Sequence, residues 1–445
     1  MQHDGLYFLP LGGTGEIGMN LNLYHHAGRW LAVDCGVMFG RTELTQFALH
    51  PDASFIAERR DALDGLVITH AHQDHVGAVR DLWPQLRCPV YATRFTVEML
   101  RSNLREVGLH GKVPLRVIED DARFSVGPFD LQRVPMTHST VEMAGLVIRT
   151  AAGTIFHTGD FKLDPEPVEG RTTDARTLRG LADQRVLACI SDSTNAHEEG
   201  WTRSEGEVAT GLREVLGAAE QRIAVALFSS NVARVHTLMR LAHELEREVV
   251  LLGRSLERTV GSARAAGYLK GLPSPVEARE YGFLPRDRVL LLCTGSQGEP
   301  RAGLTRMAED SRRDVYLEDG DTVVFSARKI PGNELFVERV QRMLTERGIH
   351  VVTADDAFVH TSGHPRRAEL RTLYDWIRPE AVVPVHGTPM HLAAHAGLAR
   401  EMGLQSYEIR NGHILRLAPG PMGVVGSVPV GRVRREEQRR GGKRR

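Results

Sequence analysis

The chain has 445 residues, which is too long for one ordinary domain and indicates two or three. Its 56 basic residues balance 56 acidic ones, so a nucleic-acid site would need a local basic patch. The four cysteines are scattered without a C-x-x-C pair, which argues against a disulfide framework and a thiolate zinc site. Neither a long apolar run nor a secretory leader pattern is present, so the composition predicts a soluble, cytoplasmic protein.

The first motif is GGTGEIG at residues 12–18, which follows the apolar run LYFLPL and matches the dinucleotide-binding fingerprint G-x-G-x-x-G. That fingerprint needs a helix directly after it, so that the helix N-terminus faces the pyrophosphate. The residues that follow here, NLNLYHHAGRWLAVDCG, alternate apolar and polar side chains around a turn, which is typical of a β-hairpin. The sequence therefore disfavours dinucleotide binding.

Short apolar segments typical of β-strands, such as GLVITH, TIFHTGD and VLACISD, follow one another up to about residue 200. From about residue 205 strands alternate with helices: RIAVALF predicts a buried strand, and NVARVHTLMRLAHELE predicts a helix with one apolar face. This alternation predicts an α/β layer with a largely parallel sheet. The final segment, GRVRREEQRRGGKRR, has eight basic and two acidic residues and is expected to be a disordered tail.

The segment GLVITHAHQDHVGA predicts a metal site. An apolar strand runs directly into four potential ligands within six residues, His70, His72, Asp74 and His75, and small residues close the loop. Imidazole nitrogens and carboxylate oxygens without sulfur suit zinc or manganese. The spacing lets His70 and His72 face one metal ion while Asp74 and His75 reach a second.

Three further candidate ligands stand at the ends of other predicted strands: His138 in VPMTHST, Asp160 in TIFHTGDFKLD and His386 in AVVPVHGT. Each alone is more typical of a structural residue, but with the first loop they complete a set of seven nitrogen and oxygen ligands. Asp160 is expected to bridge the two ions, His138 to complete the first site and His386 the second. His157 is expected to pack against its strand instead of binding metal.

In this order the motifs resemble those of the metallo-β-lactamase superfamily, of its β-CASP nuclease branch and, within that branch, of the ribonuclease J family. The resemblance spans residues 5 to about 433 and rests on LGGTGEIGMN, THAHQDHVGA, HTGDFKLD, SDSTNA, FSSNVARVH, TGSQGEP, FSARKIPGNE, HTSGH and PVHG. It implies an α/β fold, a metallo-β-lactamase αββα sandwich with an inserted β-CASP α/β domain. The expected parts are the sandwich at 1–203 and 356–420, the β-CASP domain at 204–355, and a linker with a disordered basic tail at 421–445.

The resemblance also implies residue roles. Asp192 in SDSTNA orients groups of the active site, Asp74 helps to orient the attacking water, and His364 in HTSGH protonates the leaving oxygen or stabilises its charge. Arg328 and Lys329 are expected near the cleft, with a solvated basic pair as the alternative. A segment before a predicted helix and the loop around His364 are expected to hold a substrate phosphate. These substrate-binding candidates are Ser229, Ser230, Asn231, His360, Thr361, Ser362, Gly363 and His364. A plain helix cap is the alternative interpretation of the first three.

The implied activity is that of a two-metal phosphodiesterase, a ribonuclease that degrades single-stranded RNA 5′→3′ from a 5′-monophosphate, with endonuclease activity as an addition. Two divalent ions per chain are implied, zinc or, as the alternative, manganese, and no membrane partner is expected. The competing interpretations are a β-CASP nuclease acting on DNA, a small-molecule metallo-hydrolase and a non-catalytic RNA-binding scaffold. Members of the family usually continue into a further C-terminal domain, whereas this sequence stops after VPVGRV and the basic tail. The expectation of a homodimer is weaker for that reason.

Overall fold

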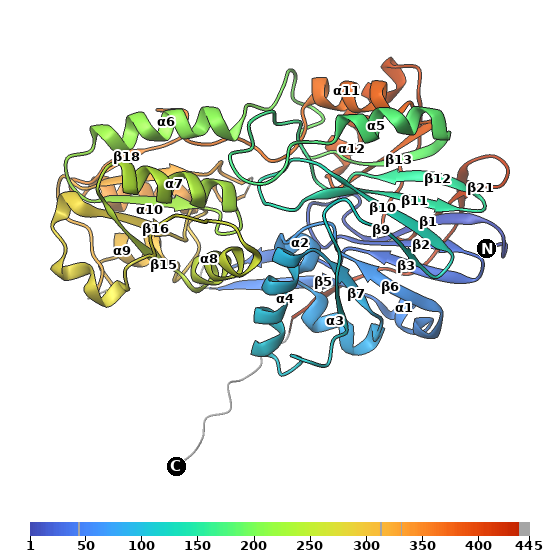
Figure 1. Ribbon diagram of the computed structural model, residues 1–445, viewed down its shortest axis with the longest axis horizontal. Helices are drawn as coiled ribbons and strands as arrows, with labels where there is room; N and C mark the ends of the chain where they lie inside the picture. Colours follow the sequence, from blue (N-terminus) through green and yellow to red (C-terminus); the bar gives the residue numbers. More distant parts are fainter. Residues whose placement is uncertain (43–44, 312–313, 331, 436–445) are drawn as a thin grey trace, which may run out of the picture.

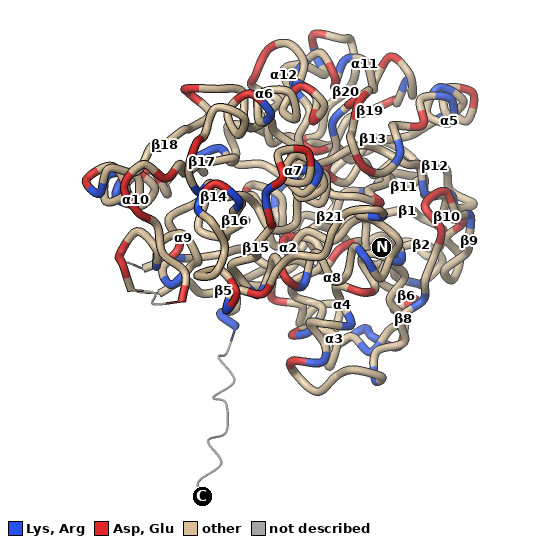
Figure 2. The backbone as a smooth tube through the Cα atoms, turned by 60° about the vertical axis from the view of Figure 1, so that its left-hand side comes forward, with Lys and Arg blue, Asp and Glu red and all other residues tan. Residues whose placement is uncertain are grey.

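The computed structural model describes residues 1–42, 45–311, 314–330 and 332–435. Two large β-sheets lie face to face in one body, and a smaller sheet with its own helices forms a second body beside it (Figure 1). Basic and acidic residues are interspersed along the chain (Figure 2), in keeping with the balanced composition. Among the described residues, no helix has the length and apolar character needed to span a bilayer.

The first large sheet has eight strands in the order β22, β21, β1, β2, β3, β6, β7, β8. Their bounds are β1 Leu6–Gly12, β2 Leu21–His26, β3 Arg29–Val33, β6 Leu63–Val67, β7 Val90–Ala92, β8 Leu115–Val117, β21 His413–Ala418 and β22 Gly423–Ser427. An apolar core joins its outer face to helices on that side. These are α1 Ser54–Ala57, α3 Val79–Leu86 and α4 Arg94–Glu106, and the single turn η1 Arg60–Ala62 lies beside them.

The second large sheet has seven strands in the order β20, β19, β13, β12, β11, β10, β9. Their bounds are β9 Arg123–Val126, β10 Phe129–Pro135, β11 Ala144–Thr150, β12 Gly153–His157, β13 Val186–Asp192, β19 Ala381–Val385 and β20 Gln405–Ser406. Helices α5 Ala175–Gly180, α11 Arg367–Ile377 and α12 Pro389–Glu401, with the turn η2 Leu181–Gln184, share a core with its outer face. A separate core, with side chains such as Phe8, Tyr24 and Ile155, fills the space between the two sheets.

The second body contains a five-stranded sheet in the order β15, β16, β14, β17, β18, in which all the pairs are parallel. The strands are β14 Ile223–Leu227, β15 Glu248–Leu252, β16 Val289–Cys293, β17 Thr322–Ser326 and β18 His350–Val352. Helices α6 Glu205–Ala218, α7 Val232–Glu244 and α8 Arg254–Ala266 share a core with one face. Helices α9 Gly303–Ala308 and α10 Glu334–Thr345, with the turn η3 Ala278–Phe283, share a core with the other. A further turn, η4 Arg286–Arg288, precedes β16. The predicted α/β alternation is confirmed.

A third, three-stranded sheet corrects the expectation for the C-terminal segment. Its order is β23, β5, β4, with bounds β4 Met38–Arg41, β5 Gln46–Pro51 and β23 Arg432–Arg434. The prediction that residues 421–445 are disordered is therefore wrong for the part up to residue 435, which contains β22 and β23. Backbone pairing with β21 and β5 orders this part, and Arg435 forms an ion pair with Asp81. Residues 436–445 lie outside the described residues.

The GGTGEIG segment connects the antiparallel strands β1 and β2, and no helix follows the motif. The hairpin predicted for the residues after it is confirmed, because β2 and β3 pair antiparallel around the turn at residues 27–28. Gly13, Gly15 and Gly18 all have positive φ, between 86° and 96°, which glycine adopts without steric cost. A Cβ on Gly13 would lie 2.1 Å from the amide oxygen of Asn20. The glycines therefore serve a tight turn that packs against Asn20.

Candidate metal centre

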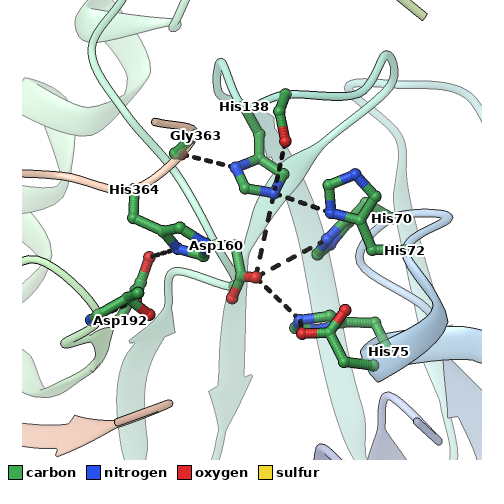
Figure 3. A network of polar contacts seen from close by, with 12 residues as sticks. His70, His72, His75, His138, Asp160, Asp192, Gly363 and His364 are labelled. Atoms are coloured by element: carbon green, nitrogen blue, oxygen red, sulfur yellow. Dashed lines mark hydrogen bonds and ion pairs between the residues drawn. The ribbon is translucent and has the colours of Figure 1, made fainter. Parts of the chain in front are cut away.

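The candidate metal ligands stand just beyond the carboxyl ends of strands in both large sheets. His70 follows β6, His138 follows β10, Asp160 follows β12 and His386 comes directly after β19. His72, Asp74 and His75 belong to the short helix α2 Gln73–Val76 and its N-cap. Because these strand ends lie at one edge of the sandwich, residues far apart in the sequence converge there (Figure 3).

The converging side chains form two groups of potential ligand atoms, and a third group, Asp160, Asp192, His364 and His386, overlaps the second. In the first group the ligand atoms of His70, His72 and His138 lie within 4.8 Å of one another, and so do those of Asp74, His75, Asp160 and His386 in the second. One carboxylate oxygen of Asp160 stands between the groups. It lies 3.9 Å from Nε2 of His70 and 4.0 Å from Nε2 of His138, but 3.0 Å from Nε2 of His75 and 3.5 Å from Nε2 of His386.

Several buried atoms of this cluster have no hydrogen-bond partner among the described residues. They are Nε2 of His70, Oδ1 of Asp160 and Nε2 of His386. A buried polar atom without a partner is unfavourable, and such groups are usually hydrogen-bonded or bind a cation. Imidazole and carboxylate donors converging in this way fit a divalent metal ion.

The protonation states of the three histidines of the first group also fit metal binding, whereas the carboxylates of Asp160, Asp74 and Asp34 overcome burial and raise the pKa of His75. Burial, helped by repulsion between neighbouring imidazoles, holds the pKa of His70 and of His138 well below the ordinary value. Burial lowers the pKa of His72 to about 4, although Asp74 and Asp160 oppose this. These rings are therefore neutral at physiological pH, and the neutral ring is the form that coordinates a metal ion.

Asp34, the residue after β3, orients His75 and was missed by the sequence analysis. Its Oδ2 lies 2.8 Å from Nδ1 of His75, which leaves Nε2 of the ring free to face Asp160. The same carboxylate accepts hydrogen bonds from the backbone N–H and the hydroxyl of Thr69, next to His70. A charged residue at the end of the buried run WLAV was the signal for it, because an acid there needs a buried partner.

Asn20 orients His386, and the sequence analysis missed this residue too. Its side-chain amide oxygen lies 3.1 Å from Nδ1 of His386, and its nitrogen lies 3.0 Å from the carbonyl oxygen of Asp74. The backbone N–H of His386 donates to the carbonyl of Gly13. The glycine turn at residues 12–18 thus supports the ligand cluster instead of a nucleotide.

His364 lies at the edge of the cluster and is held by Asp192, the last residue of β13. Its Nδ1 stands 2.7 Å from Oδ2 of Asp192 (Figure 3). Its ring stacks on that of His386 at 5.5 Å between centroids. Burial lowers the pKa of His364, but the Asp192 carboxylate and its hydrogen bond more than offset this, and the pKa rises to about 9. The ring is therefore a protonated acid at neutral pH.

Several polar groups of the loop 360–364 form hydrogen bonds within the protein. The Thr361 hydroxyl donates to the carbonyl of Arg203, and the Ser362 hydroxyl accepts from Asn195 and from the backbone N–H of His364. The carbonyl of Gly363 lies 2.6 Å from Nδ1 of His138. These contacts shape the loop and give the hydroxyls of Thr361 and Ser362 partners within the protein. Nδ1 of His360 is buried and has no hydrogen-bond partner among the described residues.

The other predicted residues are placed as follows. Asn231 is the N-cap of α7, where its side chain accepts from the N–H of Arg234, so the helix-cap alternative holds for this residue. Arg328 and Lys329 form ion pairs with Glu198 and Glu338, respectively. His157 packs beside its strand, with Nδ1 2.8 Å from the hydroxyl of Tyr24.

Both bodies of the structure match known protein domains. Residues 29–184 match the beta-lactamase superfamily domain, and residues 220–344 match the family model described as Ribonuclease J, beta-CASP domain. Residues 348–410 match the Zn-dependent metallo-hydrolase RNA specificity domain. A crystal structure of a protein of unknown function from Enterococcus faecalis V583 shares the fold, with a TM-score of 0.63 at 15% identity over 93% of this chain and 100% of that one.

The fold and the ligand cluster thus define a metallo-hydrolase with a metallo-β-lactamase fold and a β-CASP insertion. The chain is 46% identical to ribonuclease J of Sinorhizobium meliloti over 97% of its own length and 78% of that protein. It is 41% identical to ribonuclease J of Mycolicibacterium smegmatis over 96% and 78% of the two chains. It is 35% identical to ribonuclease J of Helicobacter pylori over 95% and 62%. The chain belongs to the ribonuclease J family, and the predicted family and fold class are confirmed.

Proposed function

We propose that the protein is a metal-dependent ribonuclease that hydrolyses single-stranded RNA 5′→3′ from a 5′-monophosphate and also cuts internally. The observation that carries the proposal is the convergence of seven nitrogen and oxygen ligands beside a protonated His364. A small-molecule hydrolase has no need of a second domain beside the ligand cluster. A non-catalytic scaffold would keep buried carboxylate and imidazole atoms without partners, at a cost in stability.

The two ligand groups would hold two divalent cations, with Asp160 shared between them. His70, His72 and His138 would hold one, and Asp74, His75 and His386 the other. Zinc fits the donor set best, with manganese as the alternative. When bound, such ions make water a nucleophile at neutral pH and neutralise charge that develops on a phosphoryl group.

The chain's own residues would move the protons. Asp74 lies at the open side of the cluster, with its side chain 28% exposed, and can accept a hydrogen bond from the attacking water. The attacking water gives up a proton to solvent beside Asp74. As its oxygen bonds to phosphorus, the bond between phosphorus and the leaving sugar oxygen breaks. His364 gives the proton on its Nε2 to that oxygen, while Asp192 stabilises the ring's positive charge.

Recognition of the 5′ end would use the turn before α7. Ser229 and Ser230 are partly exposed there, just before the N-terminus of a 13-residue helix, where backbone N–H groups attract an anion. The unpartnered Nδ1 of His360 is a further candidate contact. Asn231 would act by capping the helix, and the remaining members of the loop, including Ser362 and Gly363, by shaping it.

The test compares RNA and DNA oligonucleotides of one sequence, labelled at the 3′ end, with purified protein and Zn²⁺ or Mn²⁺. RNA with a 5′-monophosphate should shorten from its 5′ end, and RNA with a 5′-triphosphate should shorten more slowly. If the 5′-monophosphate and 5′-triphosphate RNAs are degraded at equal rates and give mainly internal fragments, the protein is only an endonuclease. Preferential cleavage of the DNA would replace the proposal with a DNA nuclease.

A further inference from the structure

Glu369 on α11 is a fully buried carboxylate outside the ligand cluster, and it accepts three backbone hydrogen bonds. One oxygen accepts from the N–H of Leu163 at 2.8 Å, and the other accepts from Thr202 at 2.8 Å and from Arg366 at 2.9 Å. The side chain is 0% exposed. An ordinary capping box at the start of a helix would explain only the Arg366 contact. The other two donors come from distant parts of the chain and need another explanation.

The three donors belong to the segments that build the active site. Leu163 lies three residues beyond Asp160, the residue between the two ligand groups. Thr202 lies in the connection that leaves the sandwich for the β-CASP domain. Arg366 lies two residues beyond His364. One carboxylate thus joins the Asp160 segment, the outgoing connection and the His364 loop.

Thr202 extends this junction to His364 itself. Its hydroxyl donates to the carbonyl oxygen of His364 at 2.8 Å, while its backbone N–H donates to Glu369. The chain that returns from the β-CASP domain contacts the outgoing connection nearby. The Thr361 hydroxyl of the returning chain donates to the carbonyl of Arg203 at 2.8 Å. Both connections to the β-CASP domain are therefore fixed against the loop that carries the proton donor.

We propose that Glu369, acting with Thr202, is a positioning residue that holds the His364 loop in register with the Asp160 segment. Without a carboxylate at this place, three backbone N–H groups, two of them buried, compete for fewer acceptors, and the segments they belong to move apart. Among the described residues, the hydrogen bonds of Glu369 go to Leu163, Thr202 and Arg366 and none goes to a candidate ligand, so metal binding should survive. The activity part of the inference rests on the proposed role of His364 as proton donor.

The test uses a change of leaving group. A 5′→3′ ribonuclease that regenerates a 5′-monophosphate must break the bond to the 3′ oxygen, so RNA with sulfur in place of that oxygen offers a leaving group that needs no proton. Oxygen-linked and sulfur-linked RNA are compared for Glu369→Gln, Thr202→Val and His364→Ala. Asp375→Asn is the matched control, because it makes the same change at an exposed position of the same helix.

We expect Glu369→Gln and Thr202→Val to lower kcat on the oxygen-linked RNA about tenfold and on the sulfur-linked RNA less than twofold, in the same pattern as His364→Ala. Metal content should stay at the wild-type value in both. If Glu369→Gln does not fold, Thr202→Val carries the test, because it keeps the carboxylate.

Equal losses on both RNAs for Glu369→Gln and Thr202→Val, beside a selective loss for His364→Ala, would overturn the inference. If His364→Ala itself shows no selectivity, the proposed proton transfer is wrong instead. Hydrogen exchange then decides the inference. Exchange in residues 360–366 should be faster in Glu369→Gln than in Asp375→Asn, and unchanged exchange would overturn it.

Discussion

Asp34 and His75 are joined by a 2.8 Å contact that turns one imidazole toward Asp160, at the centre of the ligand cluster. Mutation of a residue that orients a metal ligand in this way typically lowers metal affinity or activity by roughly 10–100-fold. We expect Asp34→Asn to weaken metal binding within that range, because the amide is a poorer acceptor for the N–H of His75. Titration with a competing chelator measures this, and an affinity equal to that of the wild type would contradict it.

Removal of a ligand should have a stronger effect. Asp160→Ala takes away the residue placed between the two groups, and His72→Ala takes away a member of the first group. We expect both variants to fold, to lose bound metal and to have RNA hydrolysis at background. Metal analysis of the purified proteins and a turnover assay measure this. His110→Ala, at an exposed position, is the control. Near-normal turnover with two metal ions in Asp160→Ala would show that the site is assigned wrongly.

The pH dependence of kcat should report on the contact between Asp192 and His364. A general acid works only while protonated, so with a pKa of about 9 its contribution is present at neutral pH and is lost as the pH rises through 9. Asp192→Asn removes the charge that raises this pKa, and the descending limb of kcat should move to lower pH. Profiles on saturating RNA from about pH 6 to 10 measure the shift. An unmoved limb would show that another group donates the proton.

The C-terminal segment should divide into two parts with different effects. Deletion of residues 436–445 removes five basic side chains. Each of them that neutralises an RNA phosphate adds roughly 0.7 to the slope of log affinity against log salt concentration, so the deletion should flatten this slope. Binding measured across a salt series tests this, and kcat should not change. Identical slopes would mean that this part does not touch RNA.

Deletion from residue 432 onward should also disturb the ligand helix. Arg435 donates to the carbonyl of Gly77, the C-cap of α2, and forms an ion pair with Asp81. We expect this longer deletion to lower the thermal stability and kcat, whereas the shorter one leaves both at wild-type values. Equal melting temperatures for the two deletions would show that β23 does not support α2.

The sequence patterns predicted those parts of the structure that depend on residues close together in the chain. Buried strands such as β13 and the helix α7 follow from apolar runs and 3.6-residue spacing. The convergence of the seven candidate ligands follows from their positions at or just beyond strand ends. Motif order, through the family resemblance, supplied the insertion and the expectation that Asp192 orients a group of the active site. That this group is His364 came only from the structure. The contacts of Asn20, Asp34 and Glu369 stayed hidden, because each depends on which distant segment packs against a single polar side chain. β23 was missed because its short, charged sequence pairs only when β5 is already in place.

The adjacency of β13 and β19, which pair in register from Ala188 with Ala381 to Asp192 with Val385, has a consequence for protein synthesis. The whole β-CASP domain lies between these two strands in the chain, so β19 and His386 leave the ribosome long after the other six ligands. At ordinary rates of synthesis the delay is roughly tens of seconds. For most of that time the nascent chain lacks both His386 and His364, so under the proposed function it would not yet cleave the messenger RNA from which it is being translated.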